Sequence, residues 1–269
     1  MNNYVIKIGT QGWNYEGWIG SFYPRAIRPA DFLTNYAKIF DTVEVDSTFY
    51  AVPAASVVES WKRRTPPGFT FSLKLPSEIT HKNRLRASEE ILAQFCHRAR
   101  MLGPKLAAVL IQFPPDFSPN EIFALANFLS LLPPDIRFAV EFRDREWITK
   151  DTLHLLRSYK VALALADSKW VPRELSFRIV DQPTADFAYV RWLGPRELTD
   201  FSHVQIDRTK EFRQWAEAFD VLRQNVNTIY GYLNNHYQGH SPASCNIFKK
   251  LLGLKVIEPD ALVTQPSLF

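Results

Sequence analysis

The sequence predicts an α/β chain folded as one (β/α)8 barrel, a TIM barrel with a parallel eight-stranded core, and three observations support this class. Eight short runs rich in β-branched and aromatic residues recur along the 269 residues, as strands alternating with helices do. Most of these runs are almost continuously apolar, which is typical of parallel strands buried on both faces. Helical periodicity fills most of the intervals between them, and eight such βα units make a closed barrel. An open doubly wound sheet is the alternative, but no GxGxxG turn follows any predicted strand.

The elements follow in order. The predicted strands span 5–9, 42–46, 70–75, 106–112, 137–142, 161–166, 187–193 and 228–233. The predicted helices span 31–40, 88–102, 120–132, 150–159, 210–223 and 241–252. Ser88 is the expected N-cap of its helix, because Glu89 and Glu90 follow in the first turn, where the helix dipole favours acidic groups. The unit after the sixth strand is degenerate, since Pro172 and Pro183 oppose a full helix there.

Composition excludes several classes of protein. The chain has 32 Lys+Arg and 28 Asp+Glu, a net charge of +4, and 46% hydrophobic residues, so it is neither disordered nor a fibre. No run reaches the ~18 apolar residues of a membrane helix, and the first residues lack a signal-peptide pattern. Cys96 and Cys245 have no CxxC spacing. We therefore predict a cytoplasmic protein that does not enter a membrane, with a barrel over residues 1–253 and a tail over 254–269.

Polar residues stand at or just after the carboxyl end of every predicted strand, which is the end where barrel enzymes place their chemistry. The polar and aromatic residues that we expect there are Trp13, Tyr15, Glu44, Tyr50, Lys74, His81, Gln112, Glu141, Arg143, Asp167, Arg191, Asn234 and Asn235. Charges inside apolar strands are costly to bury unless they are paired. A structural ion-pair network of Glu44, Lys74, Glu141 and Arg191 is therefore the alternative to an open site.

Six segments resemble the YecE-like family, known as domain of unknown function 72. They begin at Gly9, Val43, Ile79, Gln112, Glu141 and Asn234 and read GTQGW, VEVDSTFY, ITH, QFPP, EFR and NN. The resemblance covers about residues 5–252 and implies a TIM barrel, but it implies no activity. This chain departs from the family pattern at Gln11, Asp46 and Asp144, where Ser, Asn and His are common. The last departure removes an imidazole beside Glu141 and Arg143, which puts in doubt any mechanism that needs it.

The first functional hypothesis is an enzyme, hydrolytic if it is catalytic, that acts on a phosphorylated or nucleic-acid substrate. The predicted catalytic residues are Glu44, Glu141, His81 and Asp167, as general acids, bases or metal ligands. The predicted substrate-binding residues are Lys74, Gln112, Arg143, Arg191, Asn234, Asn235, Trp13, Tyr15 and Tyr50. Rigid guanidinium forks suit phosphate or carboxylate. Residues 62–105 also hold ten Lys+Arg and three Asp+Glu, a basic segment expected to contact phosphates.

Three alternatives remain open. A carbohydrate-processing hydrolase or isomerase would use two carboxylates at the same end of the barrel. One divalent metal ion would be ligated by His81, Glu141, Asp167 and His236, although their spacing matches no metal motif. A non-catalytic binding module is the third alternative.

The last five residues, QPSLF, resemble the pentapeptide by which bacterial repair and replication proteins dock on the DNA sliding clamp. Gln265, Leu268 and Phe269 match that motif, whereas Pro266 departs from it. Burial of Leu268 and Phe269 would contribute about 1.5–3 kcal/mol each. We expect the tail to bind a sliding clamp, with packing on the barrel itself as the alternative.

Overall fold

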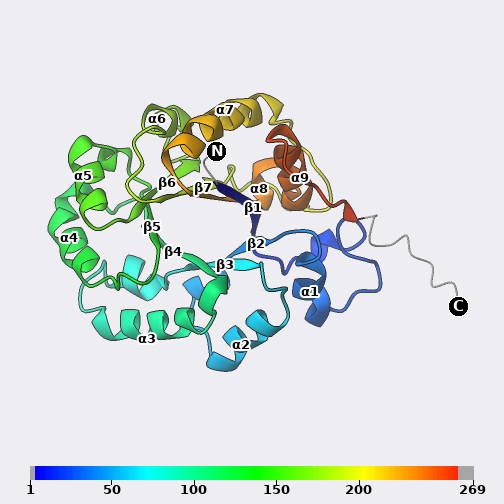
Figure 1. The fold of residues 1–269 in the computed structure, drawn as a ribbon, viewed down its shortest axis with the longest axis horizontal. Coiled ribbons are helices and arrows are strands. Elements are labelled where there is room, and N and C mark those ends of the chain that lie inside the picture. The colour runs from blue at the N-terminus through cyan, green and yellow to red at the C-terminus, as the bar shows by residue number, and fades with distance from the viewer. Residues whose placement is uncertain (1–3, 260–269) are drawn as a thin grey trace, which may run out of the picture.

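The computed structural model describes residues 4–259, and eight parallel strands close a barrel in sequence order (Figure 1). Each strand pairs with its neighbours in sequence, and β8 pairs with β1. The predicted barrel is confirmed. The strands are β1 (Val5–Gln11), β2 (Thr42–Val45), β3 (Thr70–Lys74), β4 (Leu106–Gln112), β5 (Phe138–Glu141), β6 (Ala162–Asp167), β7 (Phe187–Trp192) and β8 (Thr228–Leu233).

The helices cover the outside of this barrel. They are α1 (Phe32–Tyr36), α2 (Ala55–Arg63), α3 (Glu89–Arg100), α4 (Ile122–Ser130), α5 (Lys150–Ser158), α6 (Arg173–Arg178), α7 (Thr209–Asn225), α8 (Asn235–Gln238) and α9 (Ser241–Leu251). Short 3-10 helices lie at Glu16–Trp18, Pro29–Asp31, Ser47–Phe49, Gly103–Lys105, Pro119–Glu121 and Arg145–Trp147, and a π-helix at Glu78–Lys82.

The predicted helices are all present with shifted ends, and the sixth unit is short, because α6 has six residues and starts only after Pro172. Two helices were not predicted. Helix α2 buries Val58 and Trp61 against the barrel, and α8 is a single turn after β8. Ser88 occupies the predicted N-cap position, but its side chain does not cap the helix. Its hydroxyl donates to the Arg86 carbonyl and accepts no hydrogen bond from a backbone N–H of the helix.

Small and large residues fill the barrel interior in a complementary way. Strands β4, β5 and β6 contribute mainly alanines, whereas β7 and β8 contribute Tyr189, Tyr230 and Tyr232. The Tyr232 hydroxyl lies 2.9 Å from the Thr42 hydroxyl and 2.8 Å from the Ser72 hydroxyl, so its buried polar atom is satisfied. The side chains of the interior therefore form a packed core, as is usual for such barrels.

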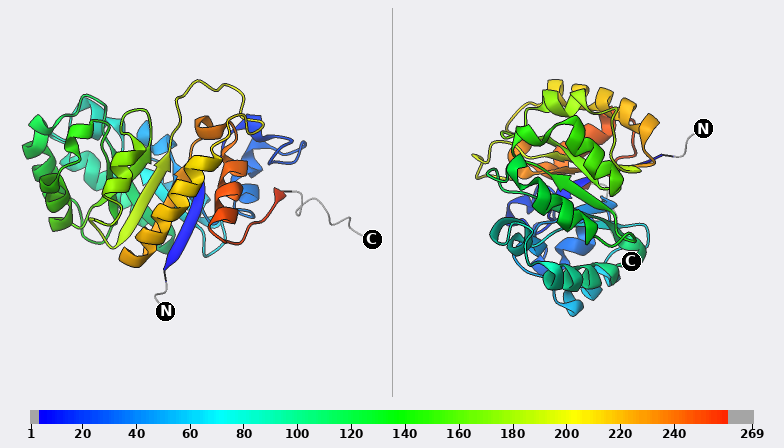
Figure 2. Two further views of the ribbon diagram at one scale, coloured as in Figure 1. Left: turned by 90° about the horizontal axis from the view of Figure 1, so that it is seen from above. Right: turned by 90° about the vertical axis from the view of Figure 1, so that its left-hand side faces the viewer.

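The carboxyl ends of all the strands meet at one end, which we call the mouth. Figure 2 (left) shows β1 rising from the amino-terminal end of the chain, with the long loop between β7 and α7 extending past the opposite end. That loop leaves β7 at Gly194, whose φ is +69°. A Cβ there would lie 2.1 Å from the His236 carbonyl oxygen, so only glycine lets the loop cross α8 at this distance.

Residues 254–259 of the predicted tail run along α9. The Asn246 side-chain amide donates to the Ile257 carbonyl at 3.3 Å and to Glu258 at 3.2 Å, and Leu254 and Ile257 pack against the core. Gln265, Leu268 and Phe269 lie outside the described residues. Within residues 4–259, no helix is both long enough and apolar enough to cross a membrane.

Candidate functional site at the barrel mouth

Alternation along the strands selects the residues that reach the mouth from inside the barrel. Successive side chains point to opposite faces, so Val43 and Val45 pack in the core under the helices while Glu44 points inward and meets Arg191 of β7. The last inward-facing residues of six strands are polar. They are Gln11, Glu44, Lys74, Gln112, Glu141 and Arg191.

Arg191 occupies the centre of the floor of the mouth and joins two carboxylates. Its Nε and Nη2 donate to Glu44 at 3.0 and 2.7 Å, and its Nη1 donates to Glu141. The Tyr189 hydroxyl donates to Glu44 at 2.7 Å. All four side chains are buried. The alternative of a structural ion-pair network is confirmed for Glu44, Glu141 and Arg191, which are satisfied by one another.

The two carboxyls nevertheless differ in their surroundings. Burial raises the pKa of Glu44, with Arg191 opposing and Asp46 adding to the rise. Burial acts in the same direction on Glu141, but Arg191 and Arg143 outweigh it and lower the pKa of Glu141 below its usual value. Glu141 faces two guanidinium groups, one of them Arg143 Nε at 3.3 Å. The surroundings therefore favour the ionised form of Glu141 more than that of Glu44.

Lys74 lies outside this network. It ends β3 with 7% exposure, and within residues 4–259 its Nζ has neither a hydrogen-bond acceptor nor a carboxylate at ion-pair distance. The Phe49 ring centroid lies 3.9 Å from Nζ. Burial lowers the pKa of Lys74 to about 8, although Asp46 opposes the shift. Partial desolvation of an ammonium that has no acceptor among the described residues is costly, so the amine form is reached closer to neutral pH than in an exposed lysine.

Asp46 borders the mouth one residue beyond β2. Its Oδ1 lies 3.9 Å from Arg191 Nη2 but is buried without a hydrogen bond among the described residues, while the side chain as a whole remains 34% exposed. Burial raises the pKa of Tyr15, and the nearby charges of Asp46 and Glu44 raise it further. Asp46 therefore presents a carboxylate to the mouth that Arg191 only partly neutralises.

Cations gather on the side of the mouth formed by the ends of β5, β6 and β7. The Arg143 guanidinium stacks 3.9 Å from the Trp170 ring centroid, with Lys169 and Arg196 at 5.2 and 5.8 Å from the same ring. Arg143 pairs with Glu141, but neither Lys169 nor Arg196 forms an ion pair with a residue in the described ranges. We call Arg143, Lys169, Trp170 and Arg196 the cationic wall.

His81 contacts Phe49, over whose ring Lys74 lies, and is close enough to Lys74 and Arg143 for their charges to act on it. Burial lowers the pKa of His81 to about 4, and the charges of Lys74 and Arg143 act in the same direction. Its Nδ1 lies 2.8 Å from the Thr80 hydroxyl, and its ring meets Phe49 edge to face at 4.9 Å. The imidazole is therefore neutral at physiological pH and adds no charge to the site.

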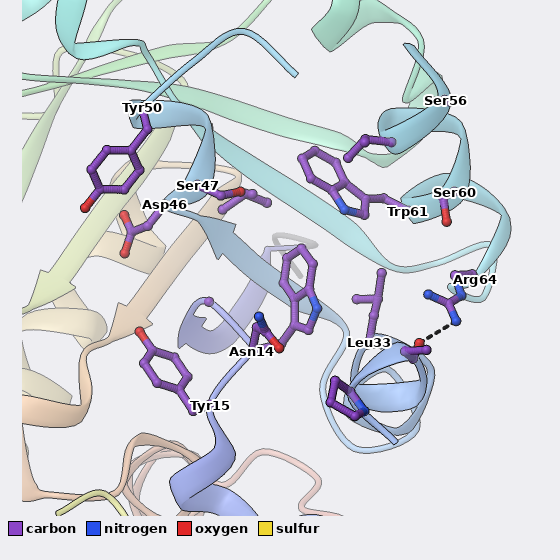
Figure 3. A pocket seen from close by; sticks show the side chains of 16 residues that line it. Asn14, Tyr15, Leu33, Asp46, Ser47, Tyr50, Ser56, Ser60, Trp61 and Arg64 are labelled. Carbon is purple, nitrogen blue, oxygen red and sulfur yellow. Dashed lines mark hydrogen bonds between the residues drawn. The ribbon is translucent and has the colours of Figure 1, made fainter. Parts of the chain in front are cut away.

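A cleft of about 730 Å³ opens beside the mouth, between the loop after β1, α1, the turn after β2, and α2. Figure 3 shows Tyr15, Asp46 and Tyr50 on one side and Trp61 on the other. The Trp13 and Trp61 ring centroids lie 5.9 Å apart at an interplanar angle of 85°. Asp46, which lines this aromatic cleft, also lies 3.9 Å from Arg191, so the cleft borders the floor of the mouth.

The predicted amides have mainly internal partners. Gln112 donates to the Phe113 carbonyl, and Asn234 donates to Gln11 at 3.0 Å. Asn235 turns away from the mouth: its Oδ1 accepts from Trp18 Nε1 at 3.0 Å and from the Ser241 backbone and hydroxyl. Asn235 thus fastens the first loop and α9 to α8.

Asp167 also faces away from the mouth. Ala164 and Ala166 face inward in β6, so Asp167, the next residue, points outward to the helices. There its Oδ2 accepts hydrogen bonds from Trp215 Nε1 at 3.0 Å and from the Tyr237 hydroxyl at 2.9 Å. The structure does not assemble the metal-ligand set of His81, Glu141, Asp167 and His236. Among residues 4–259, no three His, Cys, Asp or Glu side chains form a cluster able to hold a metal ion.

Several cations of the basic segment 62–105, which was expected to contact phosphates, have partners within the protein. Arg84 pairs with Asp116 and Glu121, and Arg100 pairs with Asp135. The Lys105 ammonium donates to two carbonyls and a hydroxyl. These contacts occupy three of the segment's ten cations. Of the others, Arg64 lines the aromatic cleft and Lys74 reaches the floor of the mouth.

Sequence reasoning missed several residues of the site. Trp61 belongs to an unpredicted helix, and Trp170, Lys169 and Arg196 lie in loops whose course no periodicity gives. Trp170 follows the end of β6 by three residues, so its position after a strand was the available signal.

A closed barrel of eight parallel strands with a polar mouth places the chain among TIM-barrel proteins. A family model described as "Protein of unknown function DUF72" matches residues 7–267, and the chain belongs to this family. The Escherichia coli (strain K12) UPF0759 protein YecE is 32% identical over 146 residues, 54% of this chain and 51% of that protein. The chain thus matches about half the length of YecE.

Other relatives align over nearly the whole length. The Bacillus subtilis UPF0759 protein YunF is 24% identical over 273 residues, covering 93% of this chain and 96% of that protein. A DUF72 family protein from Thermotoga maritima has a TM-score of 0.80 at 27% identity, covering 93% of this chain and all of that one. One from Enterococcus faecalis has a TM-score of 0.74 at 19% identity, covering 95% and 100%, and supports the fold alone. Their names state no activity.

Proposed function

We propose that the chain is an enzyme that acts at the barrel mouth on a small phosphate-bearing substrate. The observation that carries this proposal is the unbalanced positive charge on one side of the mouth. Lys169 and Arg196 have no ion-pair partner among the described residues. With Arg143, whose charge Glu141 balances, they give one side of the mouth three cations that a phosphate could contact.

The aromatic cleft supplies the second part of the substrate site. A molecule whose phosphate lies at the cationic wall would extend past Lys74 and Asp46 toward Trp13 and Trp61. Most of the cleft wall is aromatic and aliphatic, so it suits an uncharged ring or short carbon chain. In this arrangement Lys74 and Asp46 lie beside the middle of the substrate and serve as the reactive groups.

Glu44 and Glu141, predicted as catalytic, are assigned a positioning role in this proposal, because Arg191 and Tyr189 occupy their oxygens. The same contacts argue against a carbohydrate hydrolase, which needs one free acid and one free base or nucleophile. Lys74 and Asp46 provide no such pair of carboxyls.

Anion binding is tested by unfolding the protein thermally with inorganic phosphate, pyrophosphate, simple phosphate esters and a single-stranded oligonucleotide. A ligand at ten times its Kd stabilises by about 1.4 kcal/mol, which is roughly 3–6 °C for a protein of this size. We expect the shift to vanish in Arg143→Met and to persist in Arg145→Met, which removes the same charge from an exposed neighbour. Equal shifts in both variants would refute the phosphate site, and a shift with the oligonucleotide alone would assign the site to nucleic acid.

We further propose, from the sequence alone, that QPSLF docks on a bacterial sliding clamp and that the protein is cytoplasmic. The full chain and a version without the last five residues would be titrated against purified clamp. Tail-dependent binding near 1 μM, about 8 kcal/mol, is expected. Absence of binding by the full chain would remove the link to DNA.

A further inference from the structure

The chain contains two lysines that are buried to the same degree and differ in their contacts. Lys74 and Lys105 are each 7% exposed. The Lys105 ammonium donates to the Lys62 and Thr65 carbonyls at 2.6 Å and to the Thr65 hydroxyl at 3.0 Å. All three of its protons are used, which is how a buried ammonium is satisfied. Lys105 is therefore a structural cation.

Lys74 has no acceptor of this kind among the described residues. Its Nζ lies 3.9 Å over the Phe49 ring, and the nearby Arg191 and Glu141 are already joined to each other. Most of the Lys74 side chain is buried, so an ammonium in this position loses part of its hydration without gaining a hydrogen bond from a described residue, whereas a neutral amine loses much less. The surroundings of Nζ therefore make the nucleophilic amine form easier to reach than in an exposed lysine, in agreement with the pKa of Lys74, which burial lowers to about 8.

We propose that Lys74 forms an imine with the carbonyl carbon of a phosphate-bearing aldehyde or ketone. This deepens the proposed function, on which it rests, by naming the substrate class. The Nζ lone pair attacks the carbonyl carbon, one proton moves from nitrogen to the former carbonyl oxygen, and that oxygen leaves as water after taking a second proton. The overall change converts the lysine ammonium and the carbonyl compound into a protonated imine and one water molecule.

Asp46 is placed to move the protons. Among the charged neighbours it acts most strongly on the Lys74 ammonium, and its Oδ1 has no hydrogen bond from any described residue. Its oxygens lie beyond ion-pair distance of Nζ, so it would take a proton from Nζ, and return it to the leaving hydroxyl, through an intervening water molecule. Arg143 and the rest of the cationic wall would hold the phosphate, and the protonated imine would then withdraw electrons from the neighbouring carbon. The reaction class is bond cleavage or proton transfer beside a carbonyl, in place of the hydrolysis predicted from the sequence.

The test is reductive trapping in the intact protein with glycolaldehyde phosphate and cyanoborohydride, followed by peptide mapping. Glycolaldehyde is the matched probe without phosphate. Lys105 is the buried control and Lys82 the exposed one. At pH 7.5 we expect Lys74 to be labelled at least about tenfold faster than Lys82, since a pKa near 8 leaves far more amine than one near 10.4. Lys105 should stay unlabelled.

The two probes and one variant separate the two proposals. Labelling of Lys74 at no more than the Lys82 rate by both probes would overturn the imine, even if phosphate binds through Arg143. Fast labelling of Lys74 by both probes alike, unchanged in Arg143→Met, would keep the imine and overturn the phosphate site. We expect the phosphate probe to be preferred, and expect this preference to be lost in Arg143→Met and retained in Arg145→Met.

Discussion

Replacing Arg191 by Met removes the one cation that touches both buried carboxylates of the floor. Arg191 donates two hydrogen bonds to Glu44, at 2.7 and 3.0 Å, and one to Glu141. Glu44 and Glu141 are 0% and 1% exposed, so neither can recover its solvation in place. Removing one partner of a buried pair costs about 3–5 kcal/mol. Because two carboxylates lose the partner here, we expect a loss of about 5 kcal/mol at pH 7.

The loss should depend on pH in a defined direction. Without Arg191, the folded-state pKa values of Glu44 and Glu141 rise above those of the unfolded chain. A carboxyl with a raised folded-state pKa binds its proton more tightly when folded, so stability is lost as pH increases above the unfolded value of about 4.3. While both carboxyls remain protonated, the slope is about 2.7 kcal/mol per pH unit. The free energy of unfolding of the variant should therefore approach that of the wild type near pH 4.5 and become increasingly smaller than it at higher pH.

Urea unfolding monitored by tryptophan fluorescence from pH 4.5 to 8 measures this difference. Combining Arg191→Met with Glu44→Gln and Glu141→Gln should remove most of the added pH dependence, because no buried carboxyl remains in the network. Arg100→Met is the surface control, because Arg100 also donates two hydrogen bonds to one carboxylate, Asp135, at 2.7 and 2.8 Å. Both of these side chains are about half exposed, so the variant should lose less than about 1 kcal/mol of stability. A pH-independent loss in Arg191→Met, or one no larger than the control, would refute the reasoning.

Three further predictions concern single residues. Lys74→Met should stabilise the protein at pH 7 by at most about 3 kcal/mol. In the wild type, stability should rise between pH 8 and 10.5, because the unfolded lysine binds a proton there and the folded one does not, and the variant should lack this rise. A variant that urea unfolding shows to be destabilised would contradict this. Asp167→Ala should lower the free energy of unfolding by about 1–3 kcal/mol for each donor left unpaired, and Asp167→Asn should lower it less. Neither variant should change the shift in unfolding temperature that phosphate causes. Loss of phosphate binding would show that Asp167 belongs to the site. The His81 imidazole should remain neutral from pH 5 to 8 by NMR, and a titration near pH 6.5 would show that burial and the neighbouring cations do not lower its pKa.

The barrel was predictable because its signal is local and repeated. Each buried strand is a short apolar run, and each helix carries its own periodicity, so neither needs knowledge of the other. The failures were also local in origin. Helix α2 was missed because it is short and follows the turn after β2. The first strand was predicted to end at Gly9, because glycine is typical of strand ends, but β1 continues to Gln11.

The site was predicted only as a set of strand-end residues, because the sequence does not give the direction of a side chain at a strand terminus. Counting inward and outward positions along β6 from Ala164 would have directed Asp167 to the helices, but the count needs the true strand bounds. The partners of Lys74 and Lys105 come from distant segments, so no local pattern separates a satisfied buried lysine from an unsatisfied one. The cationic wall depends on Trp170, which joins side chains from three loops.

The central claim is that the mouth presents an amine, Lys74, that is available near neutral pH. Its most direct test is a pH titration of the protein carrying isotope-labelled lysine, followed by NMR at the side-chain carbon and nitrogen, with Lys74→Met identifying the signal. The account predicts that this signal titrates with a pKa of about 8, apart from the surface lysines. Titration of Lys74 together with those lysines, above pH 10, would contradict it.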